Sequence, residues 1–421
     1  MNDKTHSYIN YIFLCLFAFV LPFSTPDFPY INLTPTMIAL LLLLWLVQGQ
    51  FVNKFNLLKI NKLLFPFILS TGLYGLYVLG MLYTNNLVFG LQDLLLKLPL
   101  LLFPFLIFTI NMREWSEKYT QRILQFFVLG NIITLLISVV HSWILYKETS
   151  WIYHFHYVSA SWFHHPSYAS MYYCFSFAII IYLFLHYKTM IWEKITGIIS
   201  LILLSAEIIL LDSRAGTLTF ACVLLIFMLY ILFFRRKFIP QLLACIVFLG
   251  CISLITYKLL PNGINRIQSS ITQIQEDNAD KNKPFKEKDL RLLIWDASLK
   301  VGIKHLPFGV GTGDIKEELR EQYKKEDYTV PYEEKFNSHS QYLQLFVTLG
   351  IAGFIFFLTM VFLPFWTGYK SKNILFILFG VIMGINFLVE SMFEKQAGIM
   401  FFSFFFILLY FVSQFQKNLR I

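Results

Sequence analysis

Long apolar runs separated by short polar segments recur along almost the whole chain. An α-helix needs about 20 predominantly apolar residues to cross the hydrocarbon core of a bilayer. The pattern predicts about twelve such helices, at residues 8–24, 34–50, 62–83, 90–111, 121–146, 166–187, 193–212, 215–234, 238–260, 341–366, 374–392 and 398–416. The chain is therefore predicted to be an all-α, polytopic integral membrane protein.

Composition agrees with a membrane protein. Hydrophobic residues make up 57% of the chain and charged residues only 14%, whereas soluble proteins carry about 25% charged residues. All five cysteines fall within predicted spans and show no disulfide or zinc spacing, so we interpret them as small packing residues: Cys15, Cys174, Cys222, Cys245 and Cys251.

The lysines and arginines of the short connections alternate between the two sides of the membrane. Sixteen fall on one side and three, Lys147, Arg214 and Lys395, on the other. Because positive charge is retained in the cytoplasm, both termini are predicted to be cytoplasmic, with an uncleaved first helix. The net charge of +9 then reflects membrane orientation and contact with anionic lipids rather than nucleic-acid binding.

One long connection, residues 261–337, is predicted to lie outside, as the large extracytoplasmic loop of a single transmembrane domain spanning 1–421. Its residues 262–288 are polar and lysine-rich, which favours a mobile surface segment. From Asp289 the apolar spacing becomes helical. The glycine-rich run 309–313 lacks the Gly-Lys-Ser/Thr of a phosphate loop and predicts a flexible turn.

A polar Ser338-His339-Ser340 opens one apolar run. This position places His339 at a water–membrane boundary, where it can exchange protons. The alternative is a capping cluster, with Ser338 or Ser340 as the N-cap. Gly350 and Gly353 are expected to let a neighbouring helix approach closely.

Charged residues within the membrane are costly and point to function or to pairing. Asp93 and Lys97 are spaced i,i+4 on a predicted span, so they either neutralise each other or leave Lys97 to bind lipid phosphate. Arg214 lies in a very short outer connection, where it either pairs with Asp212 or Glu207 or binds phosphate bidentately.

The connection between the fifth and sixth predicted spans is dense in aromatic residues and holds four histidines: His154, His156, His164 and His165. It predicts either an interfacial aromatic belt or a sugar-binding platform. A zinc site is a third possibility, although no Cys or carboxylate stands at ligand spacing. His165 and Tyr168 are the candidate binding residues here.

Three spaced motifs carry a family resemblance: Arg214-x-x-x-Leu218, Arg291-x-x-x-Trp295, and His339-Ser340 followed after nine residues by Gly350 and then Gly353. Together they resemble the signature of the O-antigen ligase and polymerase superfamily. The resemblance covers about residues 200–355 by motif and the whole chain by predicted topology. On its own helix, Arg291 either decorates a surface beside Trp295 or folds over the membrane mouth.

The resemblance implies a GT-C-like, membrane-embedded glycosyltransferase that uses no metal and no cofactor. Its donor would be an undecaprenyl diphosphate-linked glycan and its acceptor a glycolipid such as lipid A core, at the outer face of a bacterial inner membrane. His339 would be the general base, and Arg214 and Arg291 would stabilise the departing diphosphate. A looser transfer assigns substrate binding to Lys97, His165, Tyr168, Trp295 and Ser340.

Two other functions remain open. A polymerase joining lipid-linked repeats shares the motifs, and the single long outer loop favours a ligase. A polysaccharide transporter or flippase would carry charges near the membrane midplane, whereas those within the predicted spans lie in the outer half. One reaction centre further requires His339 and Arg214 to lie within about 15 Å of each other.

Overall fold

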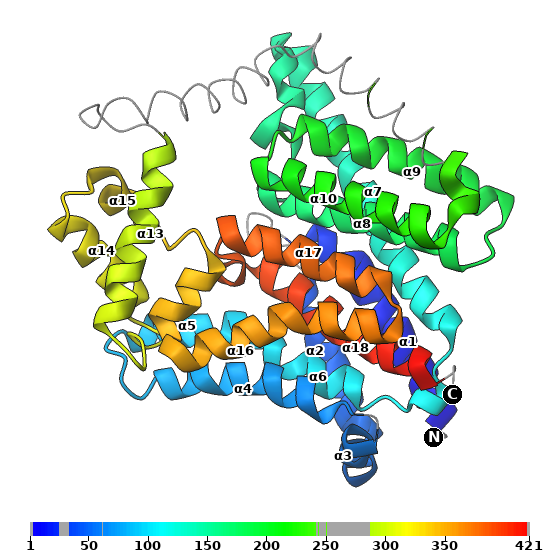
Figure 1. The fold of residues 1–421 in the computed structure, drawn as a ribbon, viewed down its shortest axis with the longest axis horizontal. Coiled ribbons are helices and arrows are strands. Elements are labelled where there is room, and N and C mark those ends of the chain that lie inside the picture. The colour runs from blue at the N-terminus through cyan, green and yellow to red at the C-terminus, as the bar shows by residue number, and fades with distance from the viewer. Residues whose placement is uncertain are drawn as a thin grey trace. The chain divides into compact units, whose positions relative to one another are not determined.

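The computed structural model describes residues 3–24, 33–60, 62–240 and 287–418, together with residues 243 and 250. All regular secondary structure in these residues is helical (Figure 1). The chain divides into two compact units, each described here by itself. Unit 1 comprises Met1–Asn131 and Arg291–Ile421, and unit 2 comprises Ile132–Leu290. Helix α7 (Glu117–Thr149) begins in unit 1 and continues into unit 2.

Unit 1 is built from both ends of the chain. Its helices are α1 (Asp3–Val20), α2 (Thr34–Gln48), α3 (Phe51–Ile60), α4 (Leu64–Gly80), α5 (Leu87–Lys97), α6 (Pro99–Phe108), α13 (Glu287–Lys304, from Arg291 onward), α14 (Ile315–Lys325), α15 (Thr329–Glu333), α16 (Gln341–Ser371), α17 (Ile374–Val389) and α18 (Gln396–Asn418). The short 3-10 helices η1 (Leu21–Phe23), η2 (Met112–Glu114) and η6 (Met392–Glu394) join some of them.

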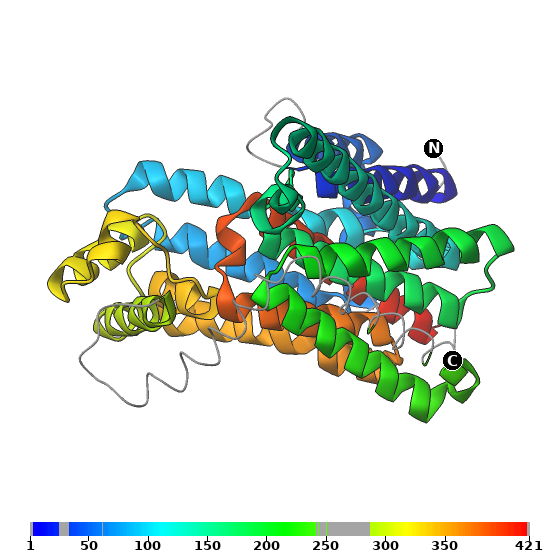
Figure 2. The same cartoon turned by 90° about the horizontal axis from the view of Figure 1, so that it is seen from above.

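Helix α18 forms the centre of unit 1. Within its apolar stretch Gln396–Phe415, 94% of the most apolar 18 residues are buried in the protein. It packs against α6, α16 and α17, and α16 in turn lies along α4 and α17 (Figures 1 and 2). Much of this core is phenylalanine, as in the edge-to-face pair of Phe103 and Phe404, whose ring centroids lie 5.4 Å apart. Burial of these rings is a large source of packing energy.

Unit 2 holds the rest of α7, the 3-10 helices η3 (Ile152–Phe155), η4 (Tyr157–Ala160) and η5 (Arg236–Phe238), and the helices α8 (Pro166–His186), α9 (Ile191–Leu210) and α10 (Arg214–Phe234). Helix α8 is its centre, and α9 and α10 pack against it. Of the most apolar 18 residues of α8, 89% are buried. Of the most apolar 18 residues of α10, only 28% are buried, so this helix exposes a large apolar surface. Such a surface is suited to lipid rather than water.

The helices agree with the predicted membrane spans. Among the described residues, seven helices are long and apolar enough to cross a membrane, and the pair α2 and α3, bent by 105°, would make an eighth. Helices α4 and α17 are apolar but shorter, and α9 falls on a further predicted span. The predicted span 238–260 lies almost entirely outside the described residues. The chain is thus an all-helical, polytopic membrane protein.

Several boundaries differ from the predicted ones. Helix α3 occupies residues assigned to a connection, and the span predicted at 90–111 consists of α5 and α6 joined at Leu98 and Pro99. Proline at the first position of α6 has no N–H to donate, which suits a helix start. Hydrophobicity marks where a span lies, but turns at such junctions depend on packing.

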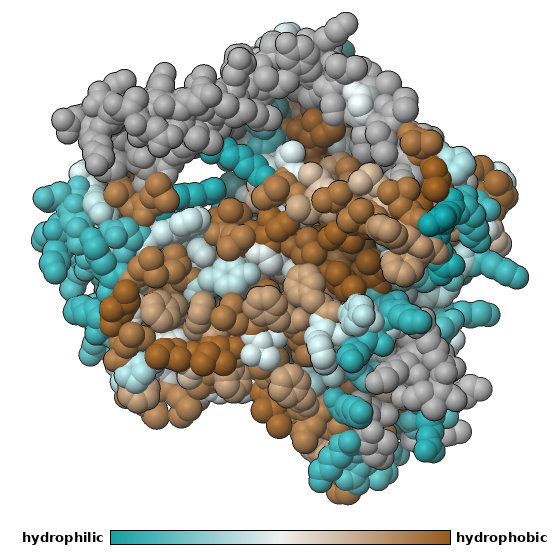
Figure 3. Space-filling model, in the orientation of Figure 1, coloured by the Kyte–Doolittle hydropathy of each residue, from teal (hydrophilic) through white to brown (hydrophobic). Residues whose placement is uncertain are grey.

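Hydrophilic side chains gather over α14 and α15, whereas apolar side chains cover the exposed face of α4 and α16 (Figure 3). The described part of the long predicted outer loop therefore contributes hydrophilic surface to unit 1. Lys300 of α13 pairs with Asp296 at 2.8 Å and with Glu326 at 3.0 Å. These hydrogen bonds raise the pKa of the Lys300 ammonium and tie α13 to the end of α14.

Candidate active site

His339 lies in the two-residue polar turn directly before α16. Its backbone has φ of 42°, a left-handed conformation that residues other than glycine rarely adopt. The backbone N–H of His339 donates to Asn337 Oδ1 at 3.0 Å, and the imidazole packs edge-on against Phe336. The side chain is 27% exposed. The imidazole is thus held in a defined position while remaining accessible.

A carboxylate faces this histidine. Glu390 Oε2 lies 3.6 Å from His339 Nδ1, an ion-pair distance if the imidazole is protonated. Glu390 follows the last residue of α17 and is 18% exposed. Glu390 falls inside the predicted span 374–392, and nothing in the sequence places it beside His339. A histidine oriented by a carboxylate on one ring nitrogen keeps the other nitrogen available for proton transfer.

The start of α16 is fastened to the end of α17 and to the connection that follows, and this brings Glu390 to His339. The N–H of Phe393 donates to Gln341 Oε1 at 2.6 Å. Tyr342 donates its hydroxyl to the Gly384 carbonyl at 3.3 Å. Ser340 occupies the N-cap position of α16, but its hydroxyl donates to the Phe387 carbonyl at 3.4 Å instead of capping the helix. The capping interpretation is thus correct for the position of Ser340 but not for its side chain, which makes no capping hydrogen bond.

Helix α16 is broken at Gly350, where φ is 61° and ψ is −149°. The glycine-rich turn of the outer loop fills the break: Val310 and Gly311 donate their N–H groups to the carbonyls of Val347 and Thr348, and Ile351 donates to Pro307. A Cβ atom on Gly350 would lie 2.0 Å from the Pro307 carbonyl oxygen. Gly350 therefore admits a turn of the outer loop, where the sequence predicted a neighbouring helix.

The same glycine-rich turn is tied to α4 and α5. Thr312 donates its hydroxyl to the Tyr77 carbonyl at 2.5 Å, and Gly313 donates its N–H to Thr84 Oγ1 at 2.8 Å. The Asp314 carboxylate accepts the backbone N–H groups of Asn85 and Asn86. The turn predicted to be flexible is instead hydrogen-bonded on both sides, and it holds the half-helix that follows His339.

Lys97 is fully buried, with 0% of its side chain exposed. Its ammonium pairs with Asp93 and, at 3.0 Å, with Glu394, and it lies over the Tyr77 ring. The i,i+4 pair considered from the sequence is therefore present, with Glu394 as an additional partner. Both carboxylates pair with the ammonium in this structure. Direct substrate binding by Lys97 stays a prediction.

Arg291 and Trp295 lie on α13. Arg291 is partly exposed, and among the described residues no carboxylate pairs with it. The indole N–H of Trp295 is buried without a hydrogen-bond partner in the described part of the chain. Further along α13, a Cβ atom on Gly302 would lie 2.5 Å from the Phe346 ring of α16. This close approach fixes α13 against the helix that follows His339.

Arg214 is the first residue of α10 in unit 2, directly after the N-cap Ser213, whose hydroxyl accepts the N–H of Gly216 at 3.2 Å. Its side chain is exposed. Asp212, considered from the sequence as an ion-pair partner of Arg214, instead faces His156 with 3.5 Å between Oδ2 and Nε2. The guanidinium therefore stands at a helix N-terminus, which favours anions.

The aromatic connection of unit 2 folds back onto α7. Ser142 donates to the Ser159 carbonyl at 3.2 Å, and the rings of His141 and Trp162 stack at 4.7 Å. His165 is the N-cap of α8, and its Nδ1 accepts the N–H of Ser167 at 3.4 Å. Tyr168 is buried. No group of three His, Cys, Asp or Glu side chains among the described residues is placed to hold a metal ion.

The chain was compared with known protein families. Residues 199–358 match the family model described as O-antigen ligase. This match supports membership of the O-antigen ligase superfamily. The matched segment contains all three of the spaced motifs, including Arg214, Arg291 and His339. Among curated proteins, none matches the chain significantly. Membership supports a function of O-antigen ligase or polymerase type, by a glycosyltransferase-like enzyme acting on lipid-linked glycans.

Glu390 and Glu394 are the residues of this site that sequence reasoning missed. Both lie outside the matched segment, in the connection between α17 and α18. Their signal in the sequence was charge alone, since Glu390 falls within the outer half of the predicted span 374–392 and Glu394 just after that span. Which cation each carboxylate meets depends on how α16, α17 and α5 pack, and no local spacing encodes that.

Proposed function

We propose that this protein transfers a glycan from undecaprenyl diphosphate to a glycolipid acceptor such as lipid A core, in one inverting displacement without a metal. The reaction takes place at the outer face of the bacterial inner membrane, with both termini in the cytoplasm. The observation that carries the proposal is the accessible His339 with Glu390 at 3.6 Å, in a member of the O-antigen ligase superfamily.

His339 acts as the general base. The Glu390 carboxylate attracts the Nδ1 proton, which leaves Nε2 to accept the proton of the acceptor hydroxyl. The hydroxyl oxygen forms a bond to the anomeric carbon as the bond from that carbon to the phosphate oxygen breaks, and the electron pair leaves with the diphosphate. Glu390 then stabilises the imidazolium that forms, as the carboxylate of a catalytic triad does.

Arg214 and Arg291 stabilise the charge that develops on the leaving diphosphate. Guanidinium groups bind phosphate bidentately without a metal, and preorganised cations lower the barrier when charge appears in the transition state. The exposure of Arg214 at the start of α10, with Asp212 turned to His156, leaves its guanidinium available for this role. The chain contains no Asp-x-Asp motif, in keeping with a reaction that uses no metal.

The predicted orientation is supported by how polar connections gather within unit 1. The turn after α4, the glycine-rich turn and the connection after α17 lie at one end of the unit. Asp314 and Thr312 bond the glycine-rich turn to Asn86 and to the Tyr77 carbonyl of α4, and Gln341 bonds the start of α16 to the connection after α17. All three segments belong to the predicted outer face. At the opposite end, Tyr410 donates to the Lys62 carbonyl and Asn373 donates to Ser413.

An in vitro transfer assay tests the proposal. Purified undecaprenyl diphosphate glycan and lipid A core are incubated with the wild-type protein or His339→Ala in the presence of EDTA. We expect wild-type transfer to persist in EDTA and the variant to lose about 10²- to 10⁴-fold in rate. Longer carrier-linked glycan without transfer to core would instead establish a polymerase. Absence of both products would refute glycosyl transfer.

A further inference from the structure

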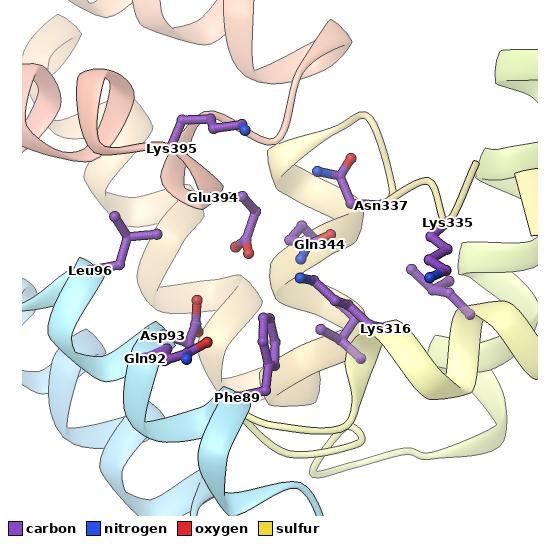
Figure 4. A pocket seen from close by; sticks show the side chains of 12 residues that line it. Phe89, Gln92, Asp93, Leu96, Lys316, Lys335, Asn337, Gln344, Glu394 and Lys395 are labelled. Carbon is purple, nitrogen blue, oxygen red and sulfur yellow. The ribbon is translucent and has the colours of Figure 1, made fainter. Parts of the chain in front are cut away.

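A cavity of about 370 Å³ lies in unit 1 between α5, α14, the segment before α16, the first turn of α16 and the connection that precedes α18. This volume falls within the range of about 300–1,000 Å³ typical of small-ligand sites. Figure 4 shows the Lys316 ammonium turned toward the middle of the cavity, with the Glu394 carboxylate also directed into it. The proposed function uses His339, which follows the cavity residue Asn337 by two positions, but it assigns nothing to the cavity itself.

The cavity carries more positive than negative charge. Its walls include Lys316, Lys335 and Lys395, and none of the three lies within ion-pair distance of a carboxylate in the described part of the chain. The two carboxylates of the wall, Asp93 and Glu394, share the buried Lys97. Counting Lys97, four lysines face two carboxylates, which leaves a net charge of +2.

The three lysines come from separate segments: α14, the turn before His339, and the residue between η6 and α18. Each is exposed rather than buried in the fold. Lys316 also lies over the ring of Phe89, with its ammonium 4.2 Å from the ring centroid. Their convergence on one cavity, without ion-pair partners of their own, points to an anionic ligand.

Amide groups of the wall are suited to sugar hydroxyls. Gln344 is only 2% exposed, and its Oε1 accepts the N–H of Ser338 at 3.3 Å. Its amide nitrogen donates to no described residue and faces the cavity, as Figure 4 shows. Asn337 likewise uses Oδ1 to accept the N–H of His339. Both amides therefore keep their N–H₂ groups for a ligand while they hold the histidine turn.

We propose that this cavity binds a sugar unit bearing a carboxylate or a phosphate, with the three lysines on the anionic group and the amides on its hydroxyls. This proposal rests on the proposed function. The charged sugar belongs to the glycan donor or to the acceptor and is held beside the turn that carries His339. The Phe89 ring supplies an apolar wall. The substrate is thereby selected for negative charge.

Binding to the full-length protein in nanodiscs tests the inference. Glucose 6-phosphate and galacturonic acid serve as charged probes and glucose as the neutral probe, titrated by calorimetry. We expect the wild type to bind the charged sugars more tightly than glucose. The variant Lys316→Gln/Lys335→Gln/Lys395→Gln should bind them about tenfold more weakly or worse, and the corresponding triple arginine variant should retain binding.

The matched control is Lys324→Gln/Lys325→Gln, which removes two exposed lysines of α14 that do not line the cavity. Equal weakening in this control would overturn the inference, because it would reflect general surface charge. Equal competition by inorganic phosphate would overturn the sugar assignment. His339→Ala should bind the probes normally. Retained probe binding with lost transfer, or lost probe binding with retained transfer, therefore separates this inference from the proposed function. In the triple glutamine variant, a KM raised for the donor alone or for the acceptor alone identifies which substrate carries the charged sugar.

Discussion

His339 combines a strained backbone with a half-open side chain. A non-glycine residue in the left-handed region costs on the order of 1–3 kcal/mol and persists where surrounding contacts enforce it. The Asn337 side chain, the Phe336 ring and the α16 start supply these contacts. In this conformation Nδ1 lies 3.6 Å from Glu390 Oε2, which is the arrangement a positioned base requires.

Glu390 is the sharpest test at the residue scale. Glu390→Gln keeps the shape of the side chain but removes the charge that stabilises an imidazolium. We expect kcat for transfer to fall on the order of 10- to 100-fold with KM for the donor nearly unchanged, and Glu390→Asp to recover part of the rate.

Steady-state kinetics over a pH series measures this effect. Glu333→Gln, an exposed charge removal on α15, is the control and should leave the rate and its pH profile unaltered. A Glu390→Gln enzyme with the wild-type kcat and pH profile would exclude the carboxylate from the reaction.

At the scale of elements, the broken helix α16 is the decisive feature. Its first half follows His339, and the outer-loop turn occupies the break by hydrogen bonds from Val310, Gly311 and Ile351. The break therefore couples the position of the histidine to the fold of the outer loop. A continuous helix through residue 350 would exclude that turn.

Gly350→Ala tests this coupling. The substitution places a methyl group 2.0 Å from the Pro307 carbonyl and forces alanine to a φ of 61°. We expect a loss of stability on the order of 2–4 kcal/mol, seen as a lower thermal midpoint in detergent. Transfer activity should fall with it.

Gly75→Ala in α4 is the matched control, because a Cβ atom there meets nothing within 4 Å. Alanine favours a helix over glycine by roughly 0.5–1 kcal/mol, so this variant should be as stable as the wild type or more so. Equal stability of the two variants would show that the loop does not enforce the break.

At the scale of the whole molecule, the proposed reaction draws on residues far apart in sequence. Groups that act together in one transition state are strongly non-additive when removed. We expect the double variant Arg214→Ala/His339→Ala to transfer glycan at a rate within about threefold of the rate of the slower single variant. Multiplied losses, measured in the same transfer assay, would assign the two residues to separate steps.

The membrane-protein class, the position of the spans and the motif residues could be predicted from the sequence because they are local properties. Hydrophobicity over 20 residues decides whether a segment enters a bilayer, wherever the rest of the chain lies. The same holds for the helix from Asp289 onward, found as α13. The spacings around Arg214, Arg291 and His339 sufficed for the family, which the match over residues 199–358 bears out.

Only the tertiary structure decided which charges meet. Glu394 reaches Lys97 across 297 positions of the chain, and Glu390 reaches His339 because α16 and α17 pack together. Nor could the sequence assign the partner of Gly350, since a glycine permits a close approach without specifying what approaches. Pairings of this kind depend on long-range packing, whereas hydrophobicity and motif spacing are fixed residue by residue.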